Sequence, residues 1–268
     1  MTAVESPRSA AAPRVSVLIP CAPKAEYLAE TLRAVEKQTF QDWEVVLVLD
    51  GECEDNRRSA ATLPPDRIRV LTTARPRSGP AVARQLGLTE CRGALLALCD
   101  ADDLCEPERF ERQVAEFDRR PDLGLLTTWA RRFDSDSKAD RGSLHCPADP
   151  AKLAARLLLF NPLTTSTAMM RTALVREFGG FDEKAVRCED YDLWLRFLGR
   201  AEVAALPVEL VRYRVHGSQY SSGRILGPQT ALLCREKLAA ARRLGLSTGV
   251  VRIKHVLWLG IQIARRRW

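Results

Sequence analysis

Three carboxylates fall within four consecutive positions, at Asp100, Asp102 and Asp103, directly after the apolar run of residues 94–99. Side chains this close repel one another and raise their own pKa values unless a cation neutralises them. Carboxylate oxygens at the end of a strand suit Mg²⁺ or Mn²⁺, and phosphate oxygens can serve as further ligands of either ion. An acidic turn in which Asp103 caps the following helix explains the same residues. The cluster is therefore a candidate metal site whose assignment depends on other signals.

A second acidic group opens the apolar segment of residues 190–198. Asp190, Leu193 and Trp194 fall on one helical face, at positions i, i+3 and i+4. A carboxylate at a helix start is held ionised by the helix dipole and can act as a general base. The alternative is an acidic first turn that stabilises its own helix, with Asp192 paired to Arg196.

His216, one of only three histidines, follows the strand expected at residues 209–215. Imidazole beside carboxylates suits Mn²⁺ better than Mg²⁺. A lone His is more often an ordinary structural residue, so His216 is a candidate metal ligand only if the fold brings it to the acidic cluster.

The elements that must position these residues alternate between strands and helices. Continuous apolar runs predict strands covered on both faces, and apolar residues at helical spacing predict helices between them. This alternation predicts an α/β fold with a mainly parallel central sheet, in which ligands lie beyond the carboxyl ends of the strands. Neither a GxGxxG fingerprint nor a P-loop is present. The expected strands are 15–19, 45–49, 68–71, 94–99 and 123–129, and the expected helices are 26–38, 80–90 and 106–119.

Beyond residue 131 the pattern becomes more polar. Residues 133–150 are rich in Asp and Ser and predict a mobile loop. Further along, we expect a helix at 151–159, strands at 166–170 and 209–215, and a helix at 190–198. The last 40 residues predict two helices, 228–243 and 248–264.

The chain has 268 residues and a net charge of +7, but the charge is uneven. Ten of the 41 Lys and Arg residues and only one acid, Glu236, lie in residues 224–268. The basic character therefore belongs to the tail, and we expect no nucleic-acid partner. The eight Cys residues stand singly, which predicts reduced buried thiols. With no secretory signal and no apolar run of membrane-spanning length, we expect a cytoplasmic protein.

Together these segments resemble the family-two inverting glycosyltransferases. The resemblance covers roughly residues 14–222 in the expected order. Its motifs lie at 15–20, 38–40, 43–46, 50–51, 79, 83–84, 100–103, 179–182, 189–194, 213–214 and 216.

The resemblance implies a GT-A fold, a nucleotide-diphospho-sugar donor that we expect to be UDP-linked, and Mn²⁺ or Mg²⁺. It implies a glycosyltransferase domain (14–222). The Ala-, Ser- and Pro-rich start predicts a disordered leader (1–13), and the charge and helical spacing of the tail predict a basic helical C-terminal extension (223–268). Within the domain, residues 14–130 would form the nucleotide-sugar half and residues 131–222 the acceptor and catalytic half.

The resemblance also implies roles for individual residues. Asp190 would be the base that takes the proton of the acceptor hydroxyl, and Glu189 and Trp194 would lie on the acceptor side, where a saccharide or a lipid-linked molecule binds. Asp102 and His216 would hold the metal. The nucleotide-sugar would contact Pro20, Cys21, Asp50, Arg84, Asp100 and Ala101.

The nucleoside pocket departs from the family pattern, because Cys21 and Ala22 stand where an aromatic residue and an Asn are usual. This departure motivates an alternative, a non-catalytic nucleotide-sugar-binding or scaffold subunit of a membrane-associated glycan assembly complex.

The tail has two interpretations. Val250, Ile253, Leu257, Gly260, Ile261 and Ala264 share a helical face, with Trp258, three Arg residues and Trp268 nearby. A basic amphipathic helix of this kind can lie on the inner face of an anionic membrane as a peripheral contact. Alternatively, its apolar face docks on the domain and leaves the Arg residues in solvent.

Overall fold

The structure is a computed structural model, and it describes residues 12–217 and 227–264. One mixed sheet of nine strands runs through the molecule in the order β3-β2-β1-β4-β8-β6-β9-β5, with β7 paired to β6. The strands are β1 (Val15–Cys21), β2 (Trp43–Leu49), β3 (Ile68–Thr72), β4 (Leu95–Leu98), β5 (Leu104–Cys105), β6 (Leu123–Asp134), β7 (Asp140–Leu144), β8 (Met169–Arg171) and β9 (Glu202–Val215).

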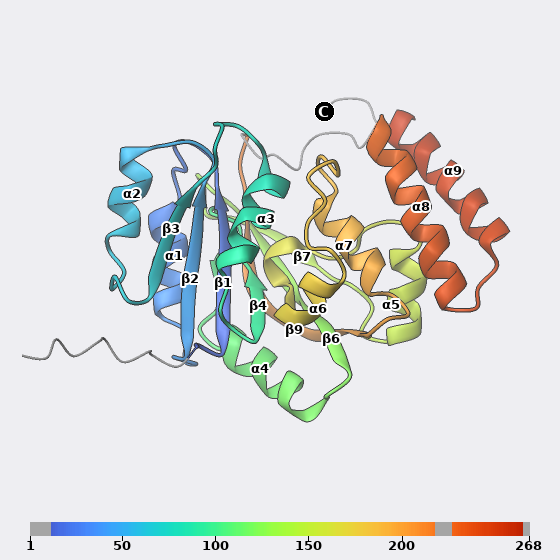
Figure 1. Cartoon of the computed structure of the whole chain (residues 1–268), viewed down its shortest axis with the longest axis horizontal. Coiled ribbons are helices and arrows are strands. Elements are labelled where there is room, and N and C mark those ends of the chain that lie inside the picture. Colours follow the sequence, from blue (N-terminus) through green and yellow to red (C-terminus); the bar gives the residue numbers. More distant parts are fainter. Residues whose placement is uncertain (1–11, 218–226, 265–268) are drawn as a thin grey trace, which may run out of the picture.

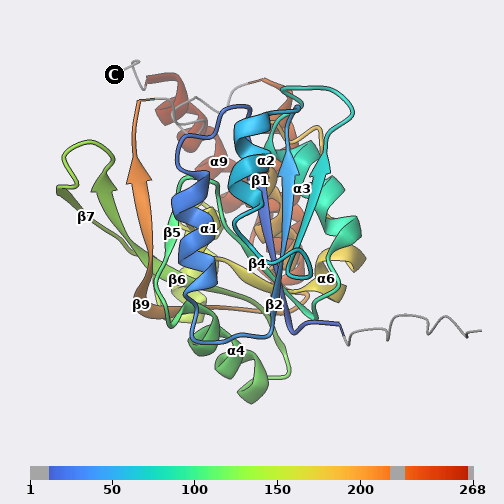
Figure 2. The same ribbon diagram turned by 90° about the vertical axis from the view of Figure 1, so that its left-hand side faces the viewer.

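The first four strands of this order are parallel, as the sequence predicts. Val17 and Leu18, neighbours on β1, belong to different hydrophobic clusters on opposite faces of the sheet, and both are fully buried. A strand covered on both faces needs apolar residues at every position, which explains the unalternated runs. In Figure 2 the arrows of β2 and β3 point the same way, so their carboxyl ends lie on one edge of the sheet.

Helices cover both faces. The apolar sides of α1 (Leu28–Glu36), α2 (Glu54–Ala60) and α4 (Arg109–Arg119) pack on one face. The other face carries α3 (Pro80–Glu90), α5 (Pro150–Leu157), α6 (Thr172–Glu177) and α7 (Glu189–Phe197). Beyond α7, α8 (Pro228–Arg243) and α9 (Thr248–Ala264) lie side by side at the end of the molecule farthest from β3 (Figure 1).

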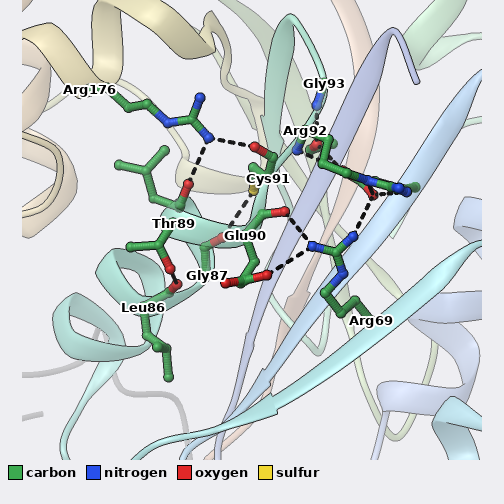
Figure 3. A network of polar contacts seen from close by, with 12 residues as sticks. Arg69, Leu86, Gly87, Thr89, Glu90, Cys91, Arg92, Gly93 and Arg176 are labelled. Carbon is green, nitrogen blue, oxygen red and sulfur yellow. Dashed lines mark hydrogen bonds and ion pairs between the residues drawn. The ribbon is translucent and has the colours of Figure 1, made fainter. Parts of the chain in front are cut away.

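Polar contacts fix the C-terminal end of α3. Arg69 of β3 donates to the carbonyl and the carboxylate of Glu90, both at 2.9 Å, and Arg176 of α6 donates to the carbonyls of Leu88 and Cys91 (Figure 3). The buried Glu44 accepts from the backbone and side chain of Arg92, each at 2.8 Å. Burial acts to raise the pKa of Glu44, but the contacts with Arg92 outweigh burial and hold this pKa below its usual value. These bonds fix α3 against the sheet.

The second half of the sheet differs from the prediction in detail. The expected mobile loop at 133–150 contains β7, an exposed edge strand that pairs antiparallel with β6, so this expectation is wrong. Its polar sequence reflects an edge strand with few buried positions. The strand expected at 166–170 is the 3₁₀ turn η1 (Thr165–Thr167) followed by β8. β6 crosses the division predicted at residue 130, so both predicted halves share one sheet.

Of the predicted leader 1–13, only residues 12 and 13 lie within the described residues. All eight Cys residues are described, and none forms a disulfide. Among the described residues, no helix combines the length and the apolar character that a membrane span requires.

Candidate active site

The acidic cluster lies in the loop after β4, and its three carboxylates have different surroundings. Asp103 is fully buried and accepts hydrogen bonds from the backbone NH of Arg214 (2.9 Å) and the hydroxyl of Ser166 (2.5 Å). Burial, with the nearby Asp102 carboxylate, raises the pKa of Asp103. The following helix begins only at Arg109, so the expected capping role of Asp103 is wrong: this carboxylate joins the loop to η1 and β9.

Asp102 and His216 meet, although 114 positions separate them. Nε2 of His216 lies 2.9 Å from Oδ2 of Asp102. The Asp102 side chain is 30% exposed and the His216 side chain 13%. Burial and the neighbouring Asp100 raise the pKa of Asp102, although the His216 contact acts in the opposite direction. The strand end therefore presents a carboxylate and an imidazole side by side, with part of the carboxylate open to solvent.

Arg214, to which the residue types alone assign no role, holds this strand end in place. Its side chain is fully buried, and Nε donates to the carbonyl of Asp102 at 2.8 Å. Nη2 donates to Glu30 of α1 at 2.9 Å. The guanidinium also lies 4.0 Å from the ring centroid of Tyr27 and 4.7 Å from that of Phe133. Arg214 thus ties α1 and β9 to the acidic loop and positions Asp102.

Arg84 connects the two acidic groups. This guanidinium, 4% exposed on α3, donates to Asp100 at 2.6 Å and forms an ion pair with Glu189 at the start of α7. Burial acts to lower the pKa of Arg84, but the two carboxylates outweigh it and raise the pKa. Burial raises the pKa of Glu189 to about 7, because the opposing effect of Arg84 does not fully offset it and Asp190 adds to the rise.

Asp190, the candidate base, is held by the segment before η1 and by η1 itself. Its Oδ2 accepts from the hydroxyl of Thr165 at 2.7 Å and from Nδ2 of Asn161 at 3.4 Å. The residue is half-buried, so part of the carboxylate remains accessible. In the sequence, Asn161 and Thr165 appear only as polar interruptions of an apolar run, and that is the one signal that could have found them.

Asp50 organises the loop that leads into α3. Oδ1 accepts from the NH of Ser78 (2.8 Å) and the hydroxyl of Thr73 (3.0 Å), and Oδ2 accepts from the NH of Gly79 (2.8 Å). The adjacent Gly51 has a φ of +108°, and a Cβ there would lie 2.8 Å from Pro76. Asp50 therefore fixes the turn that begins the helix carrying Arg84.

The other predicted nucleotide contacts lie at the ends of β1 and β4. Cys21 is 1% exposed, and burial raises the pKa of its thiol to about 12, so the thiol stays protonated at neutral pH. Pro20 and Ala101 are half-buried. Cys21 therefore presents almost no surface to a ligand.

Trp194 lies elsewhere. It is fully buried in the core, so its expected place on the acceptor side has no support in this structure. The expected pair of Asp192 and Arg196 is present at 2.7 Å. These two line a cavity of about 700 Å³ between α3, α7 and α8, and no predicted site residue lines it. The chemistry-bearing residues therefore gather outside that cavity, at the carboxyl edge of the sheet.

Residues 16–179 match the sequence profile described as "Glycosyl transferase family 2". The chain belongs to this family. The amylovoran biosynthesis glycosyltransferase AmsE of Erwinia amylovora is 29% identical over 75% of this chain and 75% of its own length. The putative glycosyltransferase EpsE of Bacillus subtilis is 29% identical over 69% of this chain and 66% of its own length.

Two solved structures share the fold of this family-2 glycosyltransferase. A fragment of S. aureus TarS in complex with UDP-GlcNAc has a TM-score of 0.71 at 18% identity, covering 92% of this chain and 71% of that one. The mannosyltransferase PcManGT of Pyrobaculum calidifontis, in complex with GDP-Man and Mn²⁺, has a TM-score of 0.57 at 17% identity, covering 96% and 77%. The predicted GT-A architecture with C-terminal helices is confirmed.

Proposed function

We propose that this family-2 glycosyltransferase moves a sugar from a nucleotide-diphospho-sugar, UDP-linked, to a hydroxyl of a saccharide or a lipid-linked acceptor, with inversion at the anomeric carbon. One observation carries the proposal: the fold joins the acidic loop after β4 to the acidic start of α7 through Arg84. The likeness to TarS, which was solved with UDP-GlcNAc, supports the choice of UDP over GDP.

The residues present fit a divalent cation. In the described parts of the chain, no three His, Cys, Asp or Glu side chains form a metal cluster. A pair of protein ligands is nevertheless what Mg²⁺ or Mn²⁺ needs when diphosphate oxygens and water complete the coordination. Asp102 and His216 face one another and supply a carboxylate oxygen and an imidazole nitrogen. A cation held by them would supply positive charge to the departing diphosphate.

The proton transfer falls to Asp190. The acceptor hydroxyl gives its proton to the accessible part of this carboxylate, while the acceptor oxygen forms a bond to the anomeric carbon. The bond from that carbon to the diphosphate breaks on the opposite face, and the nucleoside diphosphate leaves with the electron pair. Thr165 fixes the carboxylate, so the step needs little reorganisation.

A donor screen tests the function. Purified protein with Mn²⁺ is given UDP- and GDP-sugars, and release of the nucleoside diphosphate is followed beside calorimetric binding of each donor. We expect one UDP-sugar to bind and to turn over slowly with water as acceptor. Binding of no nucleotide would favour the non-catalytic scaffold subunit.

A further inference from the structure

Helix α9 packs on the protein through only one of its faces. Val251, His255, Trp258 and Gln262, spaced by four, three and four positions, are each at most 7% exposed. On α8, Nζ of Lys237 lies 4.5 Å from the centroid of the Trp258 ring. This stripe differs from the apolar face that the sequence predicts. Val250, Ile253 and Leu257 of the predicted face are exposed, and the predicted face therefore does not dock on the domain.

The opposite side of α9 presents six large apolar side chains to solvent. We call it the α9 outer face: Val250, Ile253, Val256, Leu257, Ile261 and Ile263, exposed by 49%, 64%, 65%, 62%, 56% and 66%. In the described residues only two other large apolar side chains are comparably exposed, Val186 and Leu246. Exposed apolar residues gathered on one surface indicate an interaction site, whereas scattered ones do not.

Charges border this face on both sides. At about 100° per residue, Arg252 and Lys254 fall on opposite edges of the apolar arc, and both are exposed. No acid follows Glu236 in the sequence, whereas eight Lys and Arg residues do. A second copy of this chain would set like charges against one another with no carboxylate on α9 to pair with them. An anionic lipid surface accepts both the apolar arc and its basic edges.

We infer that the α9 outer face lies on an anionic lipid bilayer, with its apolar side chains at the level of the headgroups and acyl chains. The C-terminal end of α9 lies toward the same side of the molecule as the carboxyl ends of β2 and β3 (Figures 1 and 2). The inference concerns binding and does not require sugar transfer.

Vesicle flotation of the full chain tests the inference. Vesicles of phosphatidylcholine with 30% phosphatidylglycerol are compared with pure phosphatidylcholine, at low and at high salt. We expect binding to the anionic vesicles only, weakened by salt. The double variant Ile253→Ser, Leu257→Ser should bind at least about tenfold more weakly. The double variant Arg252→Gln, Lys254→Gln should lose about fivefold for each charge removed.

Val186→Ser is the matched control, because it removes an apolar side chain of similar exposure outside α9, and its binding should equal that of the wild type. Circular dichroism and sedimentation velocity are measured on every variant. Absence of vesicle binding, equal binding to neutral vesicles, or unchanged binding of the Ile253→Ser, Leu257→Ser variant would overturn the inference. A wild-type dimer that this variant dissociates, with no vesicle binding, would assign the face to a second copy.

Discussion

The hydroxyl of Thr165 lies 2.7 Å from the carboxylate of Asp190. The next residue, Ser166, donates to Asp103 at 2.5 Å and accepts from the backbone NH of Asp100 at 3.0 Å. Consecutive residues of one short turn therefore hold the candidate base and the candidate metal loop. Arg84 makes a second, independent connection between Asp100 and the start of α7. The relative position of the two acidic groups is thus fixed twice.

Thr165→Val should reduce turnover with little effect on donor binding. The substitution keeps the shape of the side chain but removes a hydrogen bond to a charged group, and we expect a loss of about tenfold in kcat. Steady-state kinetics measures the change in kcat, and calorimetry measures the change in donor affinity. Thr164→Val is the control, since η1 uses the backbone carbonyl of Thr164 and not its hydroxyl. A drop in donor affinity with unchanged kcat would count against this role of Thr165.

Removing the metal ligands should act on donor binding. We expect Asp102→Asn to abolish the Mn²⁺-dependent part of UDP binding, and His216→Ala to weaken it by about tenfold, since a lost ligand or ligand support costs 10–100-fold in affinity. Chelation of the metal with EDTA should do the same to the wild type. Titration calorimetry with and without Mn²⁺ measures this. UDP affinity independent of Mn²⁺ in the wild type would contradict the metal assignment.

Glu189 gives stability an unusual pH dependence. Its pKa is about 7 in the folded protein and near 4.5 when unfolded, so the folded state binds more protons between these values. The free energy of unfolding should therefore fall as pH rises from 4.5 to 7, by at most about 3 kcal/mol from this group. Glu189→Gln should lack that fall. Urea unfolding of both proteins across this range checks it, and parallel pH profiles would refute it.

Glu44 should show the opposite sign. Its pKa lies below 4.5 in the folded protein, so the unfolded state binds more protons as pH falls. We expect Glu44→Gln to lose about 2 kcal/mol at pH 7, with the wild-type advantage complete above pH 4.5 and shrinking below it. Glu90→Gln, at a half-exposed pair in the same network, should cost less than about 1 kcal/mol. Equal losses in the two variants would disprove the role of burial.

Local pattern was sufficient to predict most of the fold. The apolar runs of β1 and β2 and the helical spacing of α8 and α9 lie within a few residues of the observed bounds. Short elements such as α2, α6 and β5 are not predictable from the sequence, because two to seven residues carry too little periodicity. The exposed positions of the edge strand β7 are polar, and a polar stretch of this kind also predicts a loop.

The sequence predicts which residue types form the site. It does not predict the contacts that hold them in position. Asp102 and His216 lie 114 positions apart, so residue spacing alone cannot predict that they pair. The resemblance to the family motifs does predict it, because it assigns both residues to the metal site. Thr165 and Asn161 act through contacts made only in three dimensions. Likewise, Trp194 shares a helical face with Asp190 in the sequence but lies in the core, because one turn of a helix carries it from the rim of the sheet to the interior.

The most direct test of the central claim is the turnover of Asp190→Asn. The amide keeps the size of the side chain and can still accept the hydrogen bond of Thr165, but it cannot take the proton of the acceptor hydroxyl. Transfer is followed with the donor that the wild type binds, and donor affinity is measured on the same preparation. We expect a fall in kcat of about a thousandfold or more, with donor affinity unchanged. Turnover within a few fold of the wild type would contradict it.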